Sequence, residues 1–218
     1  MEKLIKKIKI QATITTLTGI HIGGSSENVE IGGIDNPVIK LATKENQPYI
    51  PGSSIKGKLR CLLEQAAGAS EIGKDKKVNN LFGTIKSKKF NNENQPSKLI
   101  VRDAMLTEKS KNMLLKCDAL DMPYTENKFE NTIDRVKGVA KDPRQTERVP
   151  AGAEFNAEFI INVWDEDGDG KQLLDLLYQG IRMLENDYLG GSGSRGYGQV
   201  KIKLEDPIVL SDENDWKA

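Results

Sequence analysis

The stretch Pro51-Gly-Ser-Ser-Ile-Lys-Gly-Lys-Leu-Arg60 is predicted to open the first amphipathic helix of the chain, around which the other elements are organised. Ser54 is predicted to cap this helix, since a serine hydroxyl can accept a hydrogen bond from a free N–H of the first turn. Apolar residues then recur at helical spacing as far as Ala66 and predict one buried face. Lys56 and Arg60 lie four residues apart and therefore share another face.

A helix N-terminus of this kind indicates an anion site, because free N–H groups, the positive end of the helix dipole and side-chain cations converge there. We expect an RNA phosphate at this position, contacted by Ser54, Lys56, Lys58 and Arg60. A capped core helix with solvated lysines is the alternative, and it does not exclude the phosphate.

Two better-known motifs are incomplete. Gly52 to Lys58 fits the start of a Walker loop, but Leu59 stands where a Ser or Thr would hold magnesium. Asp165 to Gly170 resembles the start of an EF-hand, but Leu176 occupies the position of the bidentate Glu. The first segment is therefore not predicted to bind a nucleotide, and the second is predicted to be a turn and a helix cap.

Composition bounds the class of protein. The chain has 218 residues, 37% of them hydrophobic and 29% charged, which predicts one domain (residues 1–218) with long surface insertions. The sequence contains no run of about 18 apolar residues, so no membrane helix is predicted. The first ten residues contain no continuous apolar run of the kind found in a signal peptide, so none is predicted. Cys61 and Cys117 are expected to be reduced, and a cytoplasmic location is expected.

Charge is separated along the chain although the net charge is zero. Residues 1–150 carry 26 Lys and Arg and 18 Asp and Glu, whereas residues 151–218 carry 6 and 14. The basic part could bind phosphate while the acidic part faces away or meets the basic part of a neighbouring copy.

The order of elements predicts an α+β fold with a ferredoxin-like or RRM-like βαββαβ core. Insertions are expected at about residues 21–50, 70–98 and 121–150. The last is polar and long for a connection, which favours an extended hairpin with an apolar tip. Arg135, Arg144 and Arg148 surround this tip with positive charge and are candidate RNA contacts. Strands are predicted at residues 3–18, 99–106, 153–163 and 199–204, and helices at about 54–68 and 173–188.

Two glycine-rich segments are candidate RNA contacts. His21, the one histidine, precedes a glycine pair and could stack on a base or donate to phosphate, or it could simply anchor its loop. Residues 190–198 predict a mobile loop able to lay its N–H groups along a phosphodiester backbone, with Arg195 as the charged anchor. A flexible connector is the alternative. The loop residues expected to contact RNA are Gly191, Ser192, Gly193, Ser194 and Arg195.

These motifs together, in this order, resemble the RAMP superfamily between about residues 8 and 204. They are most similar to the repeated backbone subunit of the type III-A CRISPR effector, the Csm complex. The segments that carry the resemblance are Gly19–Gly24, Gly33–Pro37, Pro51–Arg60, Tyr124–Arg148 and Gly190–Gly198.

The resemblance implies a filament of several copies that lies along a CRISPR RNA together with other subunits of the complex. The core would hold guide phosphates, and the hairpin would act as a thumb that wedges into the guide–target duplex at regular intervals. Asp35 would be the catalytic residue and the ligand of a divalent metal, Mg²⁺ or Mn²⁺, that cuts the target RNA. Sequence recognition would then be delegated to base pairing, as in other RNA-guided systems.

The residues alone leave the role of Asp35 open, because an aspartate before Asn-Pro is typical of a turn. If it is catalytic, the 2′-OH of the target would attack the adjacent phosphate from an in-line position, leaving a 2′,3′-cyclic phosphate and a 5′-OH. An ionised aspartate, with an ordinary pKa of about 3.9, is a good metal ligand and a poor base. The alternatives are a guide-binding filament subunit without nuclease activity, and a repeat-cleaving nuclease of the same superfamily. The second is less expected, because such enzymes often use histidine.

Overall fold

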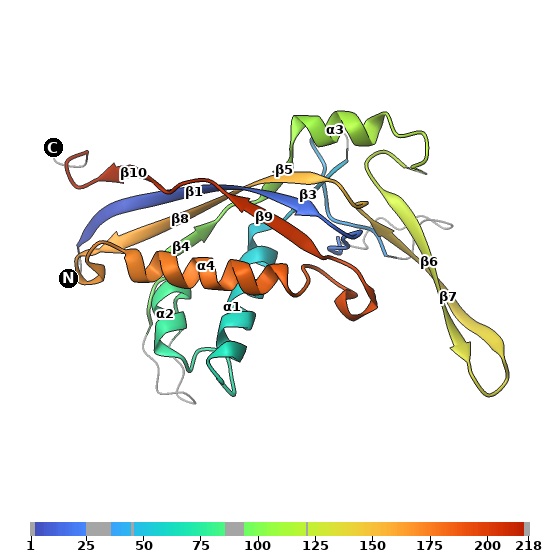
Figure 1. Ribbon diagram of the computed structural model, residues 1–218, viewed down its shortest axis with the longest axis horizontal. Coiled ribbons are helices and arrows are strands. Elements are labelled where there is room, and N and C mark those ends of the chain that lie inside the picture. Colours follow the sequence, from blue (N-terminus) through green and yellow to red (C-terminus); the bar gives the residue numbers. More distant parts are fainter. Residues whose placement is uncertain (1–2, 25–35, 45, 86–93, 121, 216–218) are drawn as a thin grey trace.

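The computed structural model describes residues 3–24, 36–44, 46–85, 94–120 and 122–215, shown in colour in Figure 1. Asp35, the predicted catalytic residue and metal ligand, lies outside the described residues. Among the described helices none is long and apolar enough to cross a membrane.

The fold is mixed α+β and is built on one antiparallel sheet. At its centre β1 (Leu4–Thr16) pairs along its length with β8 (Glu154–Trp164). The other edge of β1 pairs first with β10 (Ile208–Asp212) and then with β9 (Val200–Leu204). Four short strands extend the sheet beyond β8: β4 (Leu99–Val101), β5 (Ala104–Leu106), β3 (Gln47–Ile50) and β2 (Lys40–Leu41).

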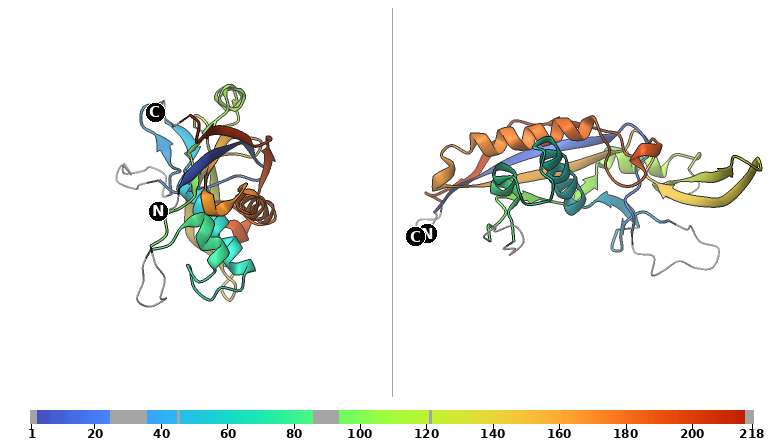
Figure 2. Two further views of the ribbon diagram at one scale, coloured as in Figure 1. Left: turned by 90° about the vertical axis from the view of Figure 1, so that its left-hand side faces the viewer. Right: turned by 90° about the horizontal axis from the view of Figure 1, so that it is seen from below.

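The period-two pattern of the sequence explains which face of this sheet is buried. On β1 the buried residues are Ile8, Ile10, Ala12, Ile14 and Thr16, all on one side of the strand. That face is covered by α1 (Gly52–Ala66) and α4 (Lys171–Glu185), with α2 (Lys76–Phe82) beside them, whereas α3 (Glu108–Leu115) lies on the opposite side (Figures 1 and 2).

A hairpin projects from one end of the sheet, and β10 lies at the opposite end (Figure 1). β6 (Glu126–Asp134) and β7 (Val139–Arg148) pair only with each other over most of their length. The carboxylate of Asp134 accepts hydrogen bonds from the N–H groups of Val136 and Lys137 and so closes the turn. The tip is apolar and exposed, with Val136 at 95%.

The predicted cap of α1 was wrong. The helix begins at Gly52, two residues before Ser54, and the carboxylate of Asp103 accepts a 2.7 Å hydrogen bond from the Gly52 N–H. A Cβ at position 52 would lie 2.2 Å from the carbonyl oxygen of Val101, so this position requires glycine. A carboxylate from the connection between β4 and β5 thus occupies the first turn, where a phosphate was predicted.

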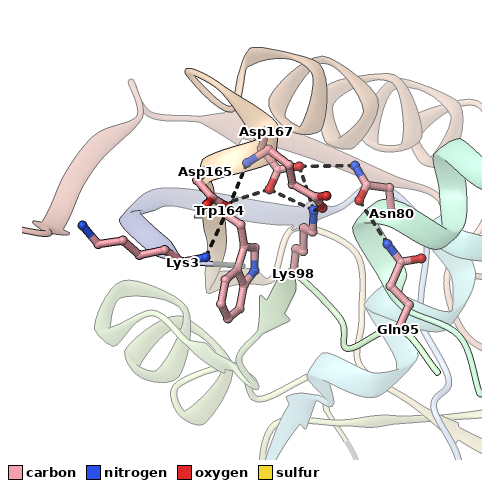
Figure 3. A network of polar contacts seen from close by, with 8 residues as sticks. Lys3, Asn80, Gln95, Lys98, Trp164, Asp165 and Asp167 are labelled. Carbon is pink, nitrogen blue, oxygen red and sulfur yellow. Dashed lines mark hydrogen bonds and ion pairs between the residues drawn. The ribbon is translucent and has the colours of Figure 1, made fainter. Parts of the chain in front are cut away.

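The acidic segment before α4 forms a short 3₁₀ turn, η1 (Asp165–Asp167), and not a calcium loop. Figure 3 shows its contacts: Asp167 accepts from the N–H of Trp164 and pairs with Lys98, whose side chain is 2% exposed. Asn80 links this pair to Gln95. The network, which we call the Lys98 cluster, ties η1 to α2 and to the segment that enters β4.

Candidate nucleic-acid interface

The glycine-rich segment after α4 is tightly packed, in contrast to the mobile loop predicted from its composition. It contains a 3₁₀ turn, η2 (Gly193–Arg195). A Cβ at Gly193 would lie 1.9 Å from the ring of Tyr188, and one at Gly190, where φ is +84°, would lie 2.3 Å from the carbonyl oxygen of His21. Glycine at these two positions therefore serves close packing. We call residues 190–198 the glycine loop.

His21 joins the glycine loop to the hairpin. Its carbonyl oxygen accepts a 2.8 Å hydrogen bond from the Gly191 N–H, and its Nδ1 lies 2.7 Å from the carbonyl oxygen of Glu147 on β7. The N–H of Gly191 is therefore already satisfied within the protein, although it was predicted to face a phosphodiester. The imidazole is half-buried, which fits the anchoring alternative.

Glu147 fixes the segment that follows Asp35. This residue is fully buried, and its carboxylate accepts from the N–H of Val38 at 2.9 Å and from the hydroxyl of Thr125 at 2.6 Å, and pairs with Lys40. The carbonyl oxygen of Asn36, the first described residue after Asp35, accepts from the Glu147 N–H at 3.1 Å. The described part of the loop is thus held at the base of the hairpin, beside His21.

Tyr197 and Glu130 connect the glycine loop directly to β6. The Tyr197 ring is buried and its hydroxyl donates to Glu130 at 2.9 Å. The ammonium of Lys128 lies 4.3 Å from the ring centroid and the guanidinium of Arg148 lies 5.2 Å away, both within the range of a cation–π interaction. Glu130 also pairs with Lys128 at 3.2 Å and with Arg195 at 3.5 Å.

These contacts shift the ionisation of both partners. Burial raises the pKa of Tyr197, the hydrogen bond to Glu130 raises it further, and the result is about 12. Burial also acts to raise the pKa of Glu130, but the Tyr197 hydrogen bond and the charges of Lys128 and Arg195 outweigh it, so this pKa is lowered. Glu130 is therefore held as a carboxylate against two cations.

Helix α1 reaches the same place through Lys58. Its ammonium lies 3.0 Å from Asp187 and 3.6 Å from the ring centroid of Tyr188, just before the glycine loop. A cavity of about 400 Å³ opens beside the loop, lined by Tyr188, Ser194 and Tyr197 among others.

Lys56 and Arg60 point to the other side of α1, because residues two apart on a helix lie about 200° apart around its axis. Lys56 donates to the hydroxyl of Ser97 and to the carbonyl oxygen of Leu99, both at 2.7 Å. Arg60 pairs with Glu64 of its own helix and donates to Asn79 of α2. Burial, then the charge of Arg60, lowers the pKa of Lys56. That Ser54, Lys56 and Arg60 contact RNA stays a prediction.

The structure therefore gathers part of the predicted set at one place, where the glycine loop, the hairpin base and α1 meet. Arg135 and Arg144 lie farther out, exposed on the hairpin, with Arg144 opposite Glu130 in the β6–β7 ladder. We call the meeting point the junction; it comprises His21, Lys58, Lys128, Arg148, Tyr188, Arg195 and Tyr197, with the carboxylates Glu126, Glu130 and Asp187.

Sequence reasoning missed Lys128, the junction carboxylates and both tyrosines. A signal existed for three of them: Glu126, Lys128 and Glu130 alternate along one arm of the predicted hairpin and therefore share one face. Tyr188 and Tyr197 flank the glycine segment, but nothing local shows that glycine packs against their rings.

No group of three or more His, Cys, Asp or Glu among the described residues is arranged to hold a metal ion. A metal site that includes Asp35 falls outside the described part of the chain, so its fit is not tested by these contacts.

Comparison with known proteins agrees with the resemblance seen in the sequence. Residues 13–201 match the model of the RAMP superfamily. A protein of Streptococcus thermophilus named CRISPR system Cms endoribonuclease Csm3 is 44% identical over 213 residues, which cover 94% of this chain and 92% of that protein. The protein of the same name from Methanocaldococcus jannaschii is 41% identical over 217 residues, covering 93% and 82%.

Solved structures show the same relationship. A structure of the Csm3–Csm4 subcomplex in the type III-A CRISPR-Cas interference complex matches with a TM-score of 0.60 at 30% identity, over 98% of this chain and 84% of the other. A type III-B Cmr-beta complex bound to cognate target RNA matches with a TM-score of 0.62 at 18% identity, over 94% and 61%, and this likeness concerns the fold alone. The chain belongs to the Csm3 family of the RAMP superfamily.

Proposed function

We propose that this protein is the repeated backbone subunit of a type III-A CRISPR effector complex, and that it is an endoribonuclease that cuts target RNA paired to the guide. The names of its relatives support the activity, and the solved Csm3–Csm4 subcomplex supports the assembly. The observation that carries the proposal is the junction, where a glycine loop, a projecting hairpin and a cationic helix face meet. Its partners are the CRISPR RNA, the target RNA, further copies of itself and other subunits, and its location is the cytoplasm.

We infer that the core is ferredoxin-like. The supporting observations are the antiparallel strand order β9-β1-β8-β4 and the position of α1 and α4 on one face of that sheet. In this arrangement the sheet and its helices form a palm, and the β6–β7 hairpin forms a thumb.

The guide strand would follow the junction with its phosphates. Arg195 is suited to this role, because its side chain is 57% exposed and a guanidinium can donate two parallel hydrogen bonds to a phosphate. Lys58, Lys128 and Arg148 would add charge along the same track, and the exposed hydroxyl of Ser194 would contact the backbone. Because none of these side chains reads base edges, guide sequence would not affect binding.

The hairpin tip would interrupt the guide–target duplex. Ile133, Val136 and Val139 are exposed there, and wedging such apolar side chains between base steps buries them while it unstacks the bases. Arg135 and Arg144 would bind the phosphates on either side of the interrupted step. One copy per repeat of the filament would give cuts at regular intervals.

Cleavage would occur where the interrupted strand passes Asp35. A nucleotide turned out of the stack can bring its 2′-OH in line with the next phosphate, and this positioning supplies much of the acceleration. The role of this chain is to hold that geometry: Glu147 fixes Asn36 and Val38 at the hairpin base, so the segment next to Asp35 keeps a constant position relative to the thumb.

We further propose that Asp35, together with phosphate oxygens of the RNA, holds Mg²⁺ or Mn²⁺. Carboxylate and phosphate oxygens are the ligands that such hard cations prefer. A bound divalent ion would stabilise the charge that develops on the phosphate.

The decisive experiment is cleavage and binding of target RNA by the assembled, guide-loaded complex. Asp35→Ala should reduce cleavage by at least about a hundredfold and leave the Kd for target RNA nearly unchanged, because binding depends on base pairing and on the junction. Asp118→Ala, an exposed aspartate after α3, is the matched control and should cut normally. A parallel loss of binding and cutting in Asp35→Ala would refute the assignment.

The metal is tested in the same assay. EDTA should stop cleavage without releasing the target, and Mg²⁺ or Mn²⁺ should restore it. If the wild-type complex does not cut target RNA with either metal, the protein is a filament subunit without nuclease activity. If the isolated protein cuts repeat RNA, it is a processing nuclease.

A further inference from the structure

We propose that Glu130 is a specificity-determining residue of the junction: its carboxylate occupies the place of an RNA phosphate, so that one junction binds RNA weakly and stable binding needs RNA that spans several copies. The inference rests on the proposed RNA-binding role of the junction and adds to it a residue that lowers affinity.

The geometry of Arg195 supplies the first step. Its Nε lies 3.5 Å from Glu130 Oε2, and its Nη2 donates to the hydroxyl of Ser192 at 2.6 Å. Nε and Nη2 lie on the same edge of the guanidinium, so this edge is engaged inside the protein. A phosphate that binds this edge in a bidentate manner must displace the Glu130 carboxylate.

Lys128 is held by the same carboxylate. Its ammonium lies 3.2 Å from Glu130 Oε1, the atom to which the Tyr197 hydroxyl also donates. Glu130 thus joins two cations from two elements, one on β6 and one in η2. Since the Glu130 side chain is 21% exposed and Arg195 is 57% exposed, this contact is accessible to a competing anion.

The other junction cations are balanced in the same way. Glu126 pairs with Arg148 at 2.6 Å and Asp187 pairs with Lys58 at 3.0 Å. Four cations thus face three carboxylates, which leaves a net charge of one at each junction. RNA affinity at physiological salt depends mainly on how many phosphates a surface neutralises, so a single junction is a weak site.

Weak single sites make binding depend on RNA length. When several copies are linked along one strand, each further contact becomes intramolecular and the affinities combine. A short RNA reaches one junction and dissociates, whereas a guide that spans several copies stays bound. Glu130 thereby favours long, fully occupied guides over RNA fragments.

The test compares Glu130→Gln with wild type in fluorescence anisotropy, using 8-nucleotide and 40-nucleotide single-stranded RNA over a range of salt. Glutamine keeps the oxygen that accepts from Tyr197 and removes the charge. We expect Glu130→Gln to bind the 8-mer about twofold to fivefold more tightly, the range for one exposed ion pair. The salt slope should steepen by about 0.7, because one more cation becomes available to a single strand.

One variant controls for a general effect. Glu213→Gln removes one negative charge just after β10, at the opposite end of the molecule from the hairpin, where Glu213 pairs with Lys3. This variant should bind the 8-mer and the 40-mer with wild-type affinity.

The outcomes separate the two proposals. If wild type binds the 40-mer but Glu130→Gln binds the 8-mer no more tightly than wild type, Glu130 is a structural residue and the inference fails while the proposed function stands. If Glu213→Gln tightens binding as much as Glu130→Gln, net charge alone explains the effect and the inference also fails. If neither wild type nor Glu130→Gln binds the 40-mer, the RNA-binding role of the junction fails with it.

Discussion

The Lys98 cluster and the junction use the same chemistry, an ammonium or guanidinium paired with carboxylates, and differ in burial. Lys98 is 2% exposed and lies 2.7 Å from Asp167, which is 4% exposed (Figure 3). Lys128, Arg195 and Glu130 of the junction are 34%, 57% and 21% exposed. Water and ions can therefore reach the junction pairs and are excluded from the Lys98–Asp167 pair.

This difference separates a structural pair from an exchangeable one. Burial alone would lower the pKa of Lys98, but hydrogen bonds to Asp167 and Glu166 outweigh it and the pKa is raised. Neither partner can leave without stranding a buried charge. In the junction a phosphate would replace a carboxylate under the proposal above, because both are anions and the cation would remain solvated during the exchange.

The largest effect should come from breaking the buried pair. Lys98→Met removes the cation and leaves Asp167 buried and uncompensated, so the free energy of unfolding should fall by about 3–5 kcal/mol. Urea denaturation followed by circular dichroism measures this loss. RNA affinity of the folded fraction should be unchanged, because the cluster lies at η1 and α2, away from the hairpin.

Lys109→Met is the matched control, since Lys109 pairs with Glu154 at 3.0 Å but is 77% exposed. Exposed pairs contribute at most about 1 kcal/mol. A loss for Lys98→Met as small as that of Lys109→Met would remove the distinction between the two kinds of pair.

Periodicity predicted the main strands and helices well, because local sequence decides them. The alternating pattern at residues 153–163 corresponds to β8 (Glu154–Trp164), and the helical pattern at residues 173–188 corresponds to α4. Helix α4 begins at Lys171, whose N–H donates to the carboxylate of Asp169. The cap of α1 could not be predicted in this way. Asp103 lies far from Gly52 in sequence and reaches it only after β4 and β5 have paired with β8 and β3.

The junction shows the same limit. The composition of 190–198 indicated a glycine loop and that of 121–150 an extended hairpin, but their contact depends on Tyr197 and Glu130, which are 67 residues apart. The cations of α1 were assigned to one site although helix geometry places Lys58 on the other side from Lys56 and Arg60. Long-range contacts therefore decide which of the predicted cations meet the glycine loop.

The two lysines of α1 allow buried and exchangeable contacts to be compared within one helix. Lys56→Met should lower the free energy of unfolding by about 1–2 kcal/mol, because it removes hydrogen bonds to Ser97 and Leu99, and its salt slope of RNA binding should flatten if Lys56 contacts RNA as predicted from the sequence. Lys58→Met removes an ion pair whose side chains are 18% and 30% exposed, together with a cation–π contact to Tyr188, so it should cost about 1–2 kcal/mol in stability. It should also reduce the salt slope by about 0.7 on single-stranded RNA.

Denaturation and anisotropy on the same two proteins measure both quantities. A flattened salt slope in Lys56→Met would confirm the RNA contact predicted from the sequence and would show that a half-buried lysine can exchange its partners. An unchanged slope in Lys58→Met would exclude Lys58 from the RNA track.

The smallest effect concerns Tyr197, a buried ring within the exchangeable site. Its pKa is about 12 in the folded protein, against an ordinary value of 10.0, so the folded state keeps this proton between these two pH values while the unfolded state loses it. The stability that the raised pKa of Tyr197 gives to the folded state is fully present below pH 10 and falls as the pH rises toward 12. The difference in Tm between wild type and Tyr197→Phe should therefore shrink from pH 9 to pH 11, because all other tyrosines and lysines titrate in both proteins and their contributions cancel.

In Glu130→Gln the pH dependence should be weaker but still present, since burial contributes most to the raised pKa of Tyr197 and Glu130 contributes next. A Tm difference that stays constant across this range would mean that water reaches the Tyr197 hydroxyl, and the hydrogen bond that joins the glycine loop to the hairpin would then be as exchangeable as the ion pairs around it.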